Sequence, residues 1–236
     1  AITQNYILQL HKILYSHMNN PVAGRTKTVQ NYISATYPDG HTETLFTPLA
    51  PYETPEALDR LCEEYNRVIG NLELEPLIAI PVFIHDFLCI HPFTDGNGRM
   101  SRLLTTLLLY RSGFYVGKYI SLEAKIAKNK DLYYDALSAS QDRWHEGEDD
   151  PVPFIKYLLG TILAAYRDFE DRFALVETKK SALETVRLAT KNKIGRFTKQ
   201  DIRELCPALS VSSVEGALRK MVASGELKRE GSGKNT

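Results

Sequence analysis

The chain has 236 residues, of which 43% are hydrophobic and 25% charged, a composition typical of globular proteins and atypical of disordered ones. No apolar run approaches the roughly 20 residues that a membrane-spanning helix needs, so we expect no membrane partner. The cysteines Cys62, Cys89 and Cys206 form no CxxC pair, so they indicate neither a disulfide framework nor a zinc site and favour a reducing, cytoplasmic setting.

The formal net charge of zero conceals an asymmetry. Residues 176–236 hold 13 Lys and Arg against 7 Asp and Glu, a net of +6, and the remaining 16 basic and 22 acidic residues give −6 for residues 1–175. Such a difference between the two parts of a chain predicts two units with different partners.

Hydrophobic periodicity predicts a mainly helical first unit over residues 1–175. The expected helices are Asn5–Met18, Thr54–Ile69, Leu77–Ile90, Ser101–Arg111, Asn129–Trp144 and Pro153–Phe173. Between the first two, β-prone runs flank Pro38-Asp39-Gly40, which predicts a hairpin within about residues 26–48 because proline presets φ and glycine accepts positive φ.

The rest of the chain divides into two further segments. A charged linker helix is expected within residues 176–195, and a small separate module in residues 196–236. The module should hold helices Thr198–Leu205 and Ser210–Ser224, followed by a basic, glycine-rich arm over residues 225–233.

The segment from His91 to Arg102, His-Pro-Phe-Thr-Asp-Gly-Asn-Gly-Arg-Met-Ser-Arg, carries the chemistry. Glycines between two helices let a ligand approach backbone N–H groups, and the start of the second helix favours an anion. Arg99 and Arg102 are three residues apart and share one side of that helix. Two guanidinium groups beside a nest of amides indicate a polyphosphate site.

Two further side chains in this segment suit phosphate chemistry. Asp95 can hold Mg²⁺, which prefers few carboxylates together with phosphate oxygens. His91 titrates near neutral pH and can take a proton from an attacking hydroxyl. Taken singly, each residue is more often structural than functional. Together within 12 residues, they would leave charge unpaired if no ligand bound.

This segment resembles the signature of the Fic family at every specified position, and the resemblance extends over about residues 2–173. It implies a mainly α Fic-type helical core with a β-hairpin flap. It also implies that His91 is the general base, that Asp95 holds Mg²⁺, and that Gly96, Asn97 and Gly98 form an anion hole. By the same resemblance, Arg99 contacts the phosphates of ATP and Arg102 reaches the γ-phosphate.

Two more segments are similar to parts of that family. Residues 131–137 resemble the helix that lines the nucleobase pocket, which makes Tyr133 and Tyr134 possible base contacts, although aromatic packing explains either residue equally well. Arg25 and Val29 lie where the flap begins, and the flap's edge aligns the target protein by strand addition. Glycine at positions 96 and 98 favours AMP transfer over the phosphorylation carried out by Doc-type relatives.

Many relatives also carry an inhibitory glutamate that pairs with the second arginine, here Arg102. The only tempting match is Glu215-Gly216, which lacks the serine or threonine four residues earlier and lies in the C-terminal module. We therefore expect the inhibitory motif upstream of Ala1, and expect the full protein to be self-inhibited.

Residues 196–236 resemble a winged helix-turn-helix domain, whose basic surface suits DNA phosphates; protein interaction or dimer formation is the alternative. The leading hypothesis is an Mg²⁺-dependent protein adenylyltransferase that moves AMP from ATP to a Ser, Thr or Tyr hydroxyl of a target protein, including itself. A DNA-binding regulator with a nucleotide-sensing core and a de-AMPylating hydrolase stay open as alternatives, and so does a homodimer.

Overall fold

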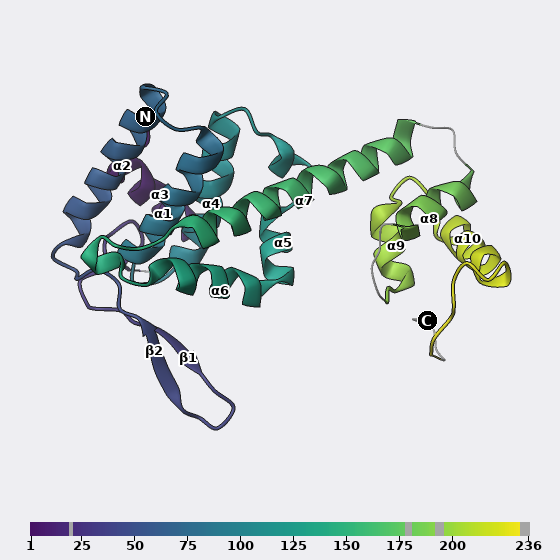
Figure 1. Cartoon of the computed structure of the whole chain (residues 1–236), viewed down its shortest axis with the longest axis horizontal. Coiled ribbons are helices and arrows are strands. Elements are labelled where there is room, and N and C mark those ends of the chain that lie inside the picture. Colours follow the sequence, from purple (N-terminus) through teal and green to yellow (C-terminus); the bar gives the residue numbers. More distant parts are fainter. Residues whose placement is uncertain (19–20, 178–180, 192–195, 232–236) are drawn as a thin grey trace. The chain divides into compact units, whose positions relative to one another are not determined.

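The computed structural model describes residues 1–18, 21–177, 181–191 and 196–231. The chain divides into two compact units, Ala1–Ala165 and Tyr166–Thr236. The described residues are mainly helical with one two-stranded hairpin (Figure 1), which confirms the predicted mixture of elements. Within the described residues, no helix is long and apolar enough to cross a membrane.

The first unit contains α1 (Gln4–Leu14), β1 (Ile33–Thr36), β2 (Thr42–Phe46), α2 (Thr54–Gly70), α3 (Pro76–Ile90), α4 (Asn97–Arg111), α5 (Leu122–Lys128), α6 (Lys130–Gln141) and most of α7 (Val152–Glu177). Two short 3₁₀ segments, η1 (Val116–Lys118) and η2 (Trp144–Glu146), connect α4 to α5 and α6 to α7.

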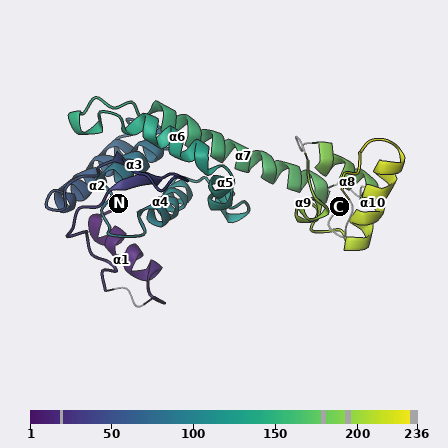
Figure 2. The same ribbon diagram turned by 90° about the horizontal axis from the view of Figure 1, so that it is seen from below.

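The core of this unit is built around α3. Its sequence is apolar on every side, and ten of its 15 residues are buried, as expected for a helix that other elements surround. It packs against α2, α4 and α6, and it lies among the helices of this unit in both views (Figures 1 and 2). Because α2, α4 and α6 pack against α3, this helix is a rigid support for the residues that directly follow its C-terminus.

The hairpin pairs β1 with β2 in antiparallel register, and Ala35 lies opposite Glu43. Gly40 takes a φ of 84° in the connecting turn, and the Tyr37 amide donates to the carbonyl of His41 (2.8 Å). The turn thus forms at Pro38-Asp39-Gly40 with a positive φ at the glycine, as predicted. The hairpin projects from the helices of the unit (Figure 1).

Several elements differ from the prediction. Helix α6 ends at Gln141 rather than Trp144, and α7 ends at Glu177 rather than Phe173. Helix α1 ends at Leu14 with Tyr15 as its C-cap rather than continuing to Met18. Helix α4 begins at Asn97 rather than Ser101, because Gly96 takes a φ of 86° directly before it. Helix α5 (Leu122–Lys128) was not predicted, since its seven residues are too few to show a clear period.

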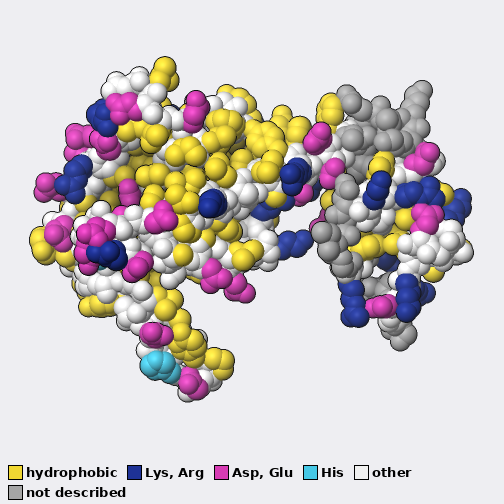
Figure 3. All heavy atoms as spheres, viewed as in Figure 1, with side chains coloured by type: hydrophobic (Ala, Val, Ile, Leu, Met, Phe, Trp, Pro, Cys, Tyr) yellow, Lys and Arg dark blue, Asp and Glu magenta, His cyan; other side chains and the backbone are white. Residues whose placement is uncertain are grey.

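The second unit contains α8 (Ala182–Lys191), α9 (Lys199–Leu205) and α10 (Val211–Ala223). These helices share a core of buried residues: Val186, Ala189, Ile202, Cys206, Val214, Ala217 and Met221. Helix α8 lies within the segment predicted as a linker, and it contributes two of these residues. In the face shown in Figure 3, lysine and arginine side chains are frequent on this unit.

The basic arm predicted after α10 is described as far as residue 231. Residues 225–231 form turns and irregular backbone without a strand. The end of the arm, residues 232–233, lies outside the described residues. The winged form of this module therefore stays a prediction.

Candidate active site at the glycine-rich loop

His91 lies directly after α3 and caps its C-terminus. Its φ of 51° and ψ of 62° are left-handed, and its backbone N–H donates to the carbonyl of Phe87 (2.9 Å). Non-glycine residues in this conformation are strained, and they concentrate at functional sites. The turn carries the chain out of the buried helix, so His91 stands at the beginning of the loop.

The ring of His91 has a defined tautomer. Its Nδ1 lies 3.2 Å from the carbonyl oxygen of Leu88. Because a carbonyl oxygen can only accept, Nδ1 carries the proton and Nε2 keeps its lone pair. Burial lowers the pKa of His91 to about 4; the Leu88 carbonyl opposes this shift and the Lys27 charge adds to it. His91 is therefore a neutral base at pH 7.

Lys27 holds the backbone on both sides of His91. Its side chain is almost fully buried, with 2% of the residue surface exposed. Its Nζ donates to the carbonyl of Ile90 and to Oδ1 of Asn31, both at 3.0 Å, while its amide donates to the carbonyl of Pro92 (2.8 Å). Burial lowers the pKa of Lys27 to about 8. The segment before the hairpin is thus fastened to the loop.

Asn97 closes the loop with its side chain. Its Oδ1 accepts from the amide of Phe93 (2.9 Å), and its Nδ2 donates to the Phe93 carbonyl (2.6 Å). The buried Phe93 ring stacks on His11 with 3.7 Å between the ring centroids. The side chain of Asn97 therefore shapes the loop. The backbone amide of Asn97, a residue predicted to form part of the anion hole, is the group that can face a ligand.

Gly96 is required by the backbone. Besides its positive φ, a Cβ at this position would lie 2.8 Å from the hydroxyl oxygen of Tyr15. Asn97 and Gly98 form the first turn of α4, where backbone N–H groups have no acceptor within the helix and the helix dipole favours an anion. The predicted anion site thus lies at the N-terminus of a 15-residue helix.

Asp95 is held as a carboxylate by groups from two helices. Its Oδ2 accepts from the hydroxyl of Tyr15 and from Arg99 (2.9 Å). The hydrogen bond from Tyr15 is the largest cause that lowers the pKa of Asp95. Burial and the same bond raise the pKa of Tyr15 to about 12, so the phenol stays protonated and remains the donor.

These groups fit Mg²⁺ by their chemistry. Asp95 offers hard carboxylate oxygens, and its side chain is 65% exposed. Its Oδ1 accepts from the Gly96 amide, so three described donors occupy three of about four lone-pair positions of the carboxylate. One position is left, which suits an ion that takes one protein carboxylate and fills its shell with phosphate and water oxygens.

The second arginine has an acidic partner. The Nε of Arg102 donates to Oε1 of Glu123 on α5 at 3.0 Å. This pair could not be predicted from the sequence, since 21 residues separate Arg102 from Glu123. Arg99 and Arg102 both lie in the first turns of α4, and each is paired with a carboxylate: Arg99 with Asp95 and Arg102 with Glu123. The expectation that these charges would be unpaired without a ligand is therefore wrong for both arginines.

The remaining predicted site residues differ in exposure. Tyr133 is buried and packs edge-on against Phe154 and Tyr157, whereas the neighbouring Tyr134 is 57% exposed. Burial raises the pKa of Tyr133 to about 12. Arg25 and Val29 are both exposed before the hairpin, at the surface where a target protein is predicted to dock.

Sequence reasoning missed His11, Tyr15 and Lys27. The Nε2 of His11 donates to the carbonyl of Asp95 (3.0 Å), and its Nδ1 accepts from the amide of Gly24 (2.9 Å). His11 and Tyr15 are four residues apart and face the loop from one side of α1. This spacing of two polar aromatic residues was the sequence signal for the pair. The signal is weak, because the sequence does not indicate which residues they contact.

The second unit has a cavity of about 1000 Å³ between α9, α10 and the segment after α10. Its charged lining residues are Arg196, Lys199, Asp201, Glu215, Arg219, Glu226, Lys228, Arg229 and Glu230. Both signs of charge are present, so the lining is mixed rather than uniformly basic.

A neutral histidine, a carboxylate, two arginines and a helix N-terminus thus lie within one loop of a helical core. Residues 1–109 match the model of the Fic/DOC family. This part of the chain is therefore a Fic/DOC domain.

Among curated proteins, the chain is 32% identical over 108 residues to protein adenylyltransferase fic-1 of Caenorhabditis elegans, which covers 46% of this chain and 19% of that protein. It is 30% identical over 117 residues to protein adenylyltransferase Fic of Nematostella vectensis, covering 48% and 24%. The chain thus matches about a fifth to a quarter of the length of these relatives.

Among solved structures, a fragment of Fic-1 from C. elegans aligns with a TM-score of 0.52 and 28% identity, over 70% of this chain and 42% of that one. The mainly helical fold with a small hairpin is accordingly the Fic fold.

Proposed function

We propose that the chain is a protein adenylyltransferase that transfers AMP from ATP to a hydroxyl side chain of a protein. One observation supports it above the others: His91, whose Nε2 keeps its lone pair, begins the loop that leads through Asp95 to the N-terminus of α4, where Arg99 and Arg102 lie. The names of the curated relatives point to the same reaction.

In the proposed reaction, ATP lies with its phosphates at the first turn of α4. The target hydroxyl oxygen attacks the α-phosphorus while Nε2 of His91 takes the hydroxyl proton. The new phosphorus–oxygen bond forms as the bond to the β-phosphate oxygen breaks, and pyrophosphate leaves. The helix amides and arginines offset the negative charge, so the chain contributes position and electrostatics.

Asp95 would hold Mg²⁺, which neutralises phosphate charge when bound. The ion pair between Arg99 and Asp95 is largely exposed, and such pairs contribute only about 0–1 kcal/mol. Arg99 can therefore exchange this contact for a phosphate oxygen at little cost. Tyr15 keeps the carboxylate in place during the exchange.

The test compares His91→Ala with His17→Ala, which alters an exposed histidine outside the loop. With α-labelled ATP, the first variant should lose protein labelling by at least a hundredfold and still bind ATP, while the second should label normally. Persistent labelling by His91→Ala would show that His91 is not the base. Equal melting temperatures exclude misfolding as the cause.

The target is proposed to add as a strand along the hairpin, where Arg25 and Val29 are exposed, and the chain itself is one possible substrate. Mass spectrometry of the chain after incubation with ATP would find AMP on one of its own Ser, Thr or Tyr residues. The same experiment with other nucleotides would measure nucleotide preference.

The reverse reaction, removal of AMP, is a second candidate because it uses the same loop. Loss of label from an AMP-modified protein, without pyrophosphate in the buffer, would favour this hydrolase. Label that stays on the protein would favour transfer.

We further propose that residues 196–236 form a winged helix-turn-helix module that contacts DNA, with Arg219 and Lys220 of α10 exposed for phosphates. The net charge of +6 over residues 176–236 supports this. A DNA-binding regulator with a nucleotide-sensing core is the corresponding alternative function.

A duplex-DNA titration over a range of salt concentrations tests the module. Replacing both Arg219 and Lys220 by alanine should reduce the slope of log K against log salt by about 2. Exposed Arg25→Ala serves as the control. Absence of binding by the unmodified chain at low salt would contradict the proposal.

A further inference from the structure

A second cluster of ligating side chains lies on α3, one and a half turns before His91. It consists of His85 and Asp86 on α3 and Asp149 in the segment before α7. The facing nitrogen and oxygen atoms of the three side chains all lie within 4.8 Å of one another. His85 has no exposed side-chain surface, and Asp86 and Asp149 are 30% and 19% exposed. The glycine-rich loop uses none of the three.

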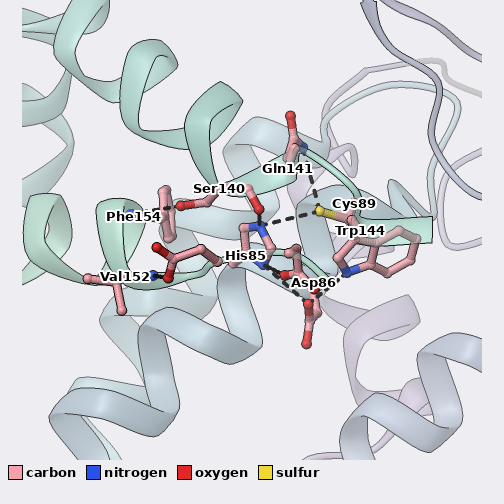
Figure 4. Close-up of polar contacts among 10 residues, drawn as sticks. His85, Asp86, Cys89, Ser140, Gln141, Trp144, Val152 and Phe154 are labelled. Carbon is pink, nitrogen blue, oxygen red and sulfur yellow. Dashed lines mark hydrogen bonds and ion pairs between the residues drawn. The ribbon is translucent and has the colours of Figure 1, made fainter. Parts of the chain in front are cut away.

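The tautomer of His85 is set by a group outside the cluster. Its Nε2 lies 3.0 Å from the carbonyl oxygen of Ser140 (Figure 4). A carbonyl oxygen can only accept, so Nε2 carries a proton. The thiol of Cys89 is farther from Nε2, at 3.7 Å, and accepts from Gln141.

The opposite ring nitrogen then presents a lone pair to two carboxylates. The Nδ1 of His85 is 3.2 Å from Oδ1 of Asp86 and 3.8 Å from Oδ2 of Asp149. In the neutral ring, none of these three atoms can donate to another. A proton on Nδ1 would satisfy Asp86, but 3.8 Å is too long for a hydrogen bond to Asp149. A cation between the three atoms would satisfy all of them.

The spacing and the surroundings suit a metal ion. Two ligands that lie about 2.0–2.2 Å from a tetrahedral Zn²⁺ are about 3.4 Å apart, close to the two distances above. Metal-bound histidines usually donate their other ring N–H to a carbonyl or carboxylate, as His85 does to Ser140. Asp86 Oδ1 is oriented by the indole N–H of Trp144 at 3.0 Å (Figure 4).

We propose that His85, Asp86 and Asp149 bind a divalent transition metal ion, with Zn²⁺ as the ion that suits one imidazole and two carboxylates. The ion would tie α3 to the segment between α6 and α7. Its role is structural: it fixes the helix from which His91 projects and takes no part in phosphate chemistry.

Zn²⁺ titration of the metal-free chain, followed by thermal unfolding, tests the proposal. At a free Zn²⁺ concentration about a hundred times the Kd, the melting temperature should rise by about 5–10 °C. Asp149→Asn should lose this rise, since it removes a charged ligand at the edge of the cluster without opening a cavity. Asp142→Asn, an exposed aspartate in the same segment, and His91→Ala should keep it.

Co²⁺ provides a second readout that does not depend on stability. Binding at the cluster should give visible ligand-field absorption that Zn²⁺ displaces and that Asp149→Asn abolishes. No Zn²⁺-dependent rise in the unaltered chain would overturn the proposal. An equal rise in Asp149→Asn would overturn it as well, because the ion would then be bound elsewhere.

Discussion

The guanidinium of Arg102 and the carboxylate of Glu123 form an ion pair, with 3.0 Å between Nε and Oε1. Arg102 is the residue proposed to reach the γ-phosphate of ATP, so Glu123 and the nucleotide compete for it. Because the pair is partly exposed, it contributes at most about 1 kcal/mol.

If the proposed function holds, Glu123→Gln should lower the KM for ATP about two- to fivefold, the fold-change that corresponds to that energy. The kcat should change little, since Glu123 does not contact the reacting atoms. Steady-state kinetics with Glu63→Gln, an exposed glutamate on α2, as the matched control would check this. An unchanged KM would mean that the pair does not compete with ATP.

The protonation of His91 sets the pH dependence of the transfer reaction. The base must be neutral, and burial lowers its pKa to about 4, so the neutral form predominates at every pH above that value. We expect kcat/KM to be level between pH 6 and pH 8, and to fall only as the pH decreases toward 4. An acid limb centred near 6.5, the ordinary histidine value, would contradict this environment for His91.

Lys27→Met should destabilise the first unit. It removes two hydrogen bonds of Nζ and leaves the carbonyl of Ile90 without that donor, which costs about 1–3 kcal/mol of unfolding free energy for a buried group. The variant should also raise the pKa of His91, because a neighbouring positive charge is lost. Urea unfolding beside Lys156→Met, an exposed lysine on α7, measures the first effect. Equal unfolding free energies for Lys27→Met and Lys156→Met would exclude a role of Lys27 in holding the backbone beside His91.

Two glycines of the loop should respond differently to alanine. Gly96→Ala places a Cβ 2.8 Å from the Tyr15 hydroxyl at a φ of 86°, so we expect a loss of more than about 1 kcal/mol in stability and displacement of the phenol that holds Asp95. Gly98→Ala meets only the flexible end of Arg102 at 3.4 Å and should be tolerated by the fold. Thermal unfolding of both variants checks this. Similar melting temperatures for Gly96→Ala and Gly98→Ala would contradict the prediction that only the first destabilises the fold.

Tyr134 can be tested as a nucleobase contact. Tyr134 is exposed, and base stacking on an aromatic ring contributes about 1–3 kcal/mol, so Tyr134→Ala should raise the KM for ATP at least about fivefold without lowering the melting temperature. Tyr52→Ala, which removes an 84% exposed tyrosine, is the control. A normal KM would leave Tyr134 a surface residue without a role in ATP binding.

The sequence alone determined the local features of this protein. The helices other than α5 follow from periodicity over contiguous residues, and the hairpin turn follows from Pro38-Asp39-Gly40. A glycine turn followed by a helix that carries two arginines three apart could be predicted for residues 91–102, because all these features are defined within a dozen residues; the chemistry of the loop stays a prediction. The boundary of α4 was harder, since it depends on the backbone conformation of Gly96 rather than on apolar spacing.

Only the tertiary structure decided which distant groups surround that loop. Tyr15 contacts Asp95 across 80 positions of sequence, Lys27 contacts Ile90 across 63, and Arg102 pairs with Glu123 on a helix that periodicity did not reveal. Such contacts arise because α1 packs against α2, α5 against α4, and both α2 and α4 against α3, so each long-range contact depends on the whole core. Residue types predict what a side chain can do, whereas packing decides which partner it meets.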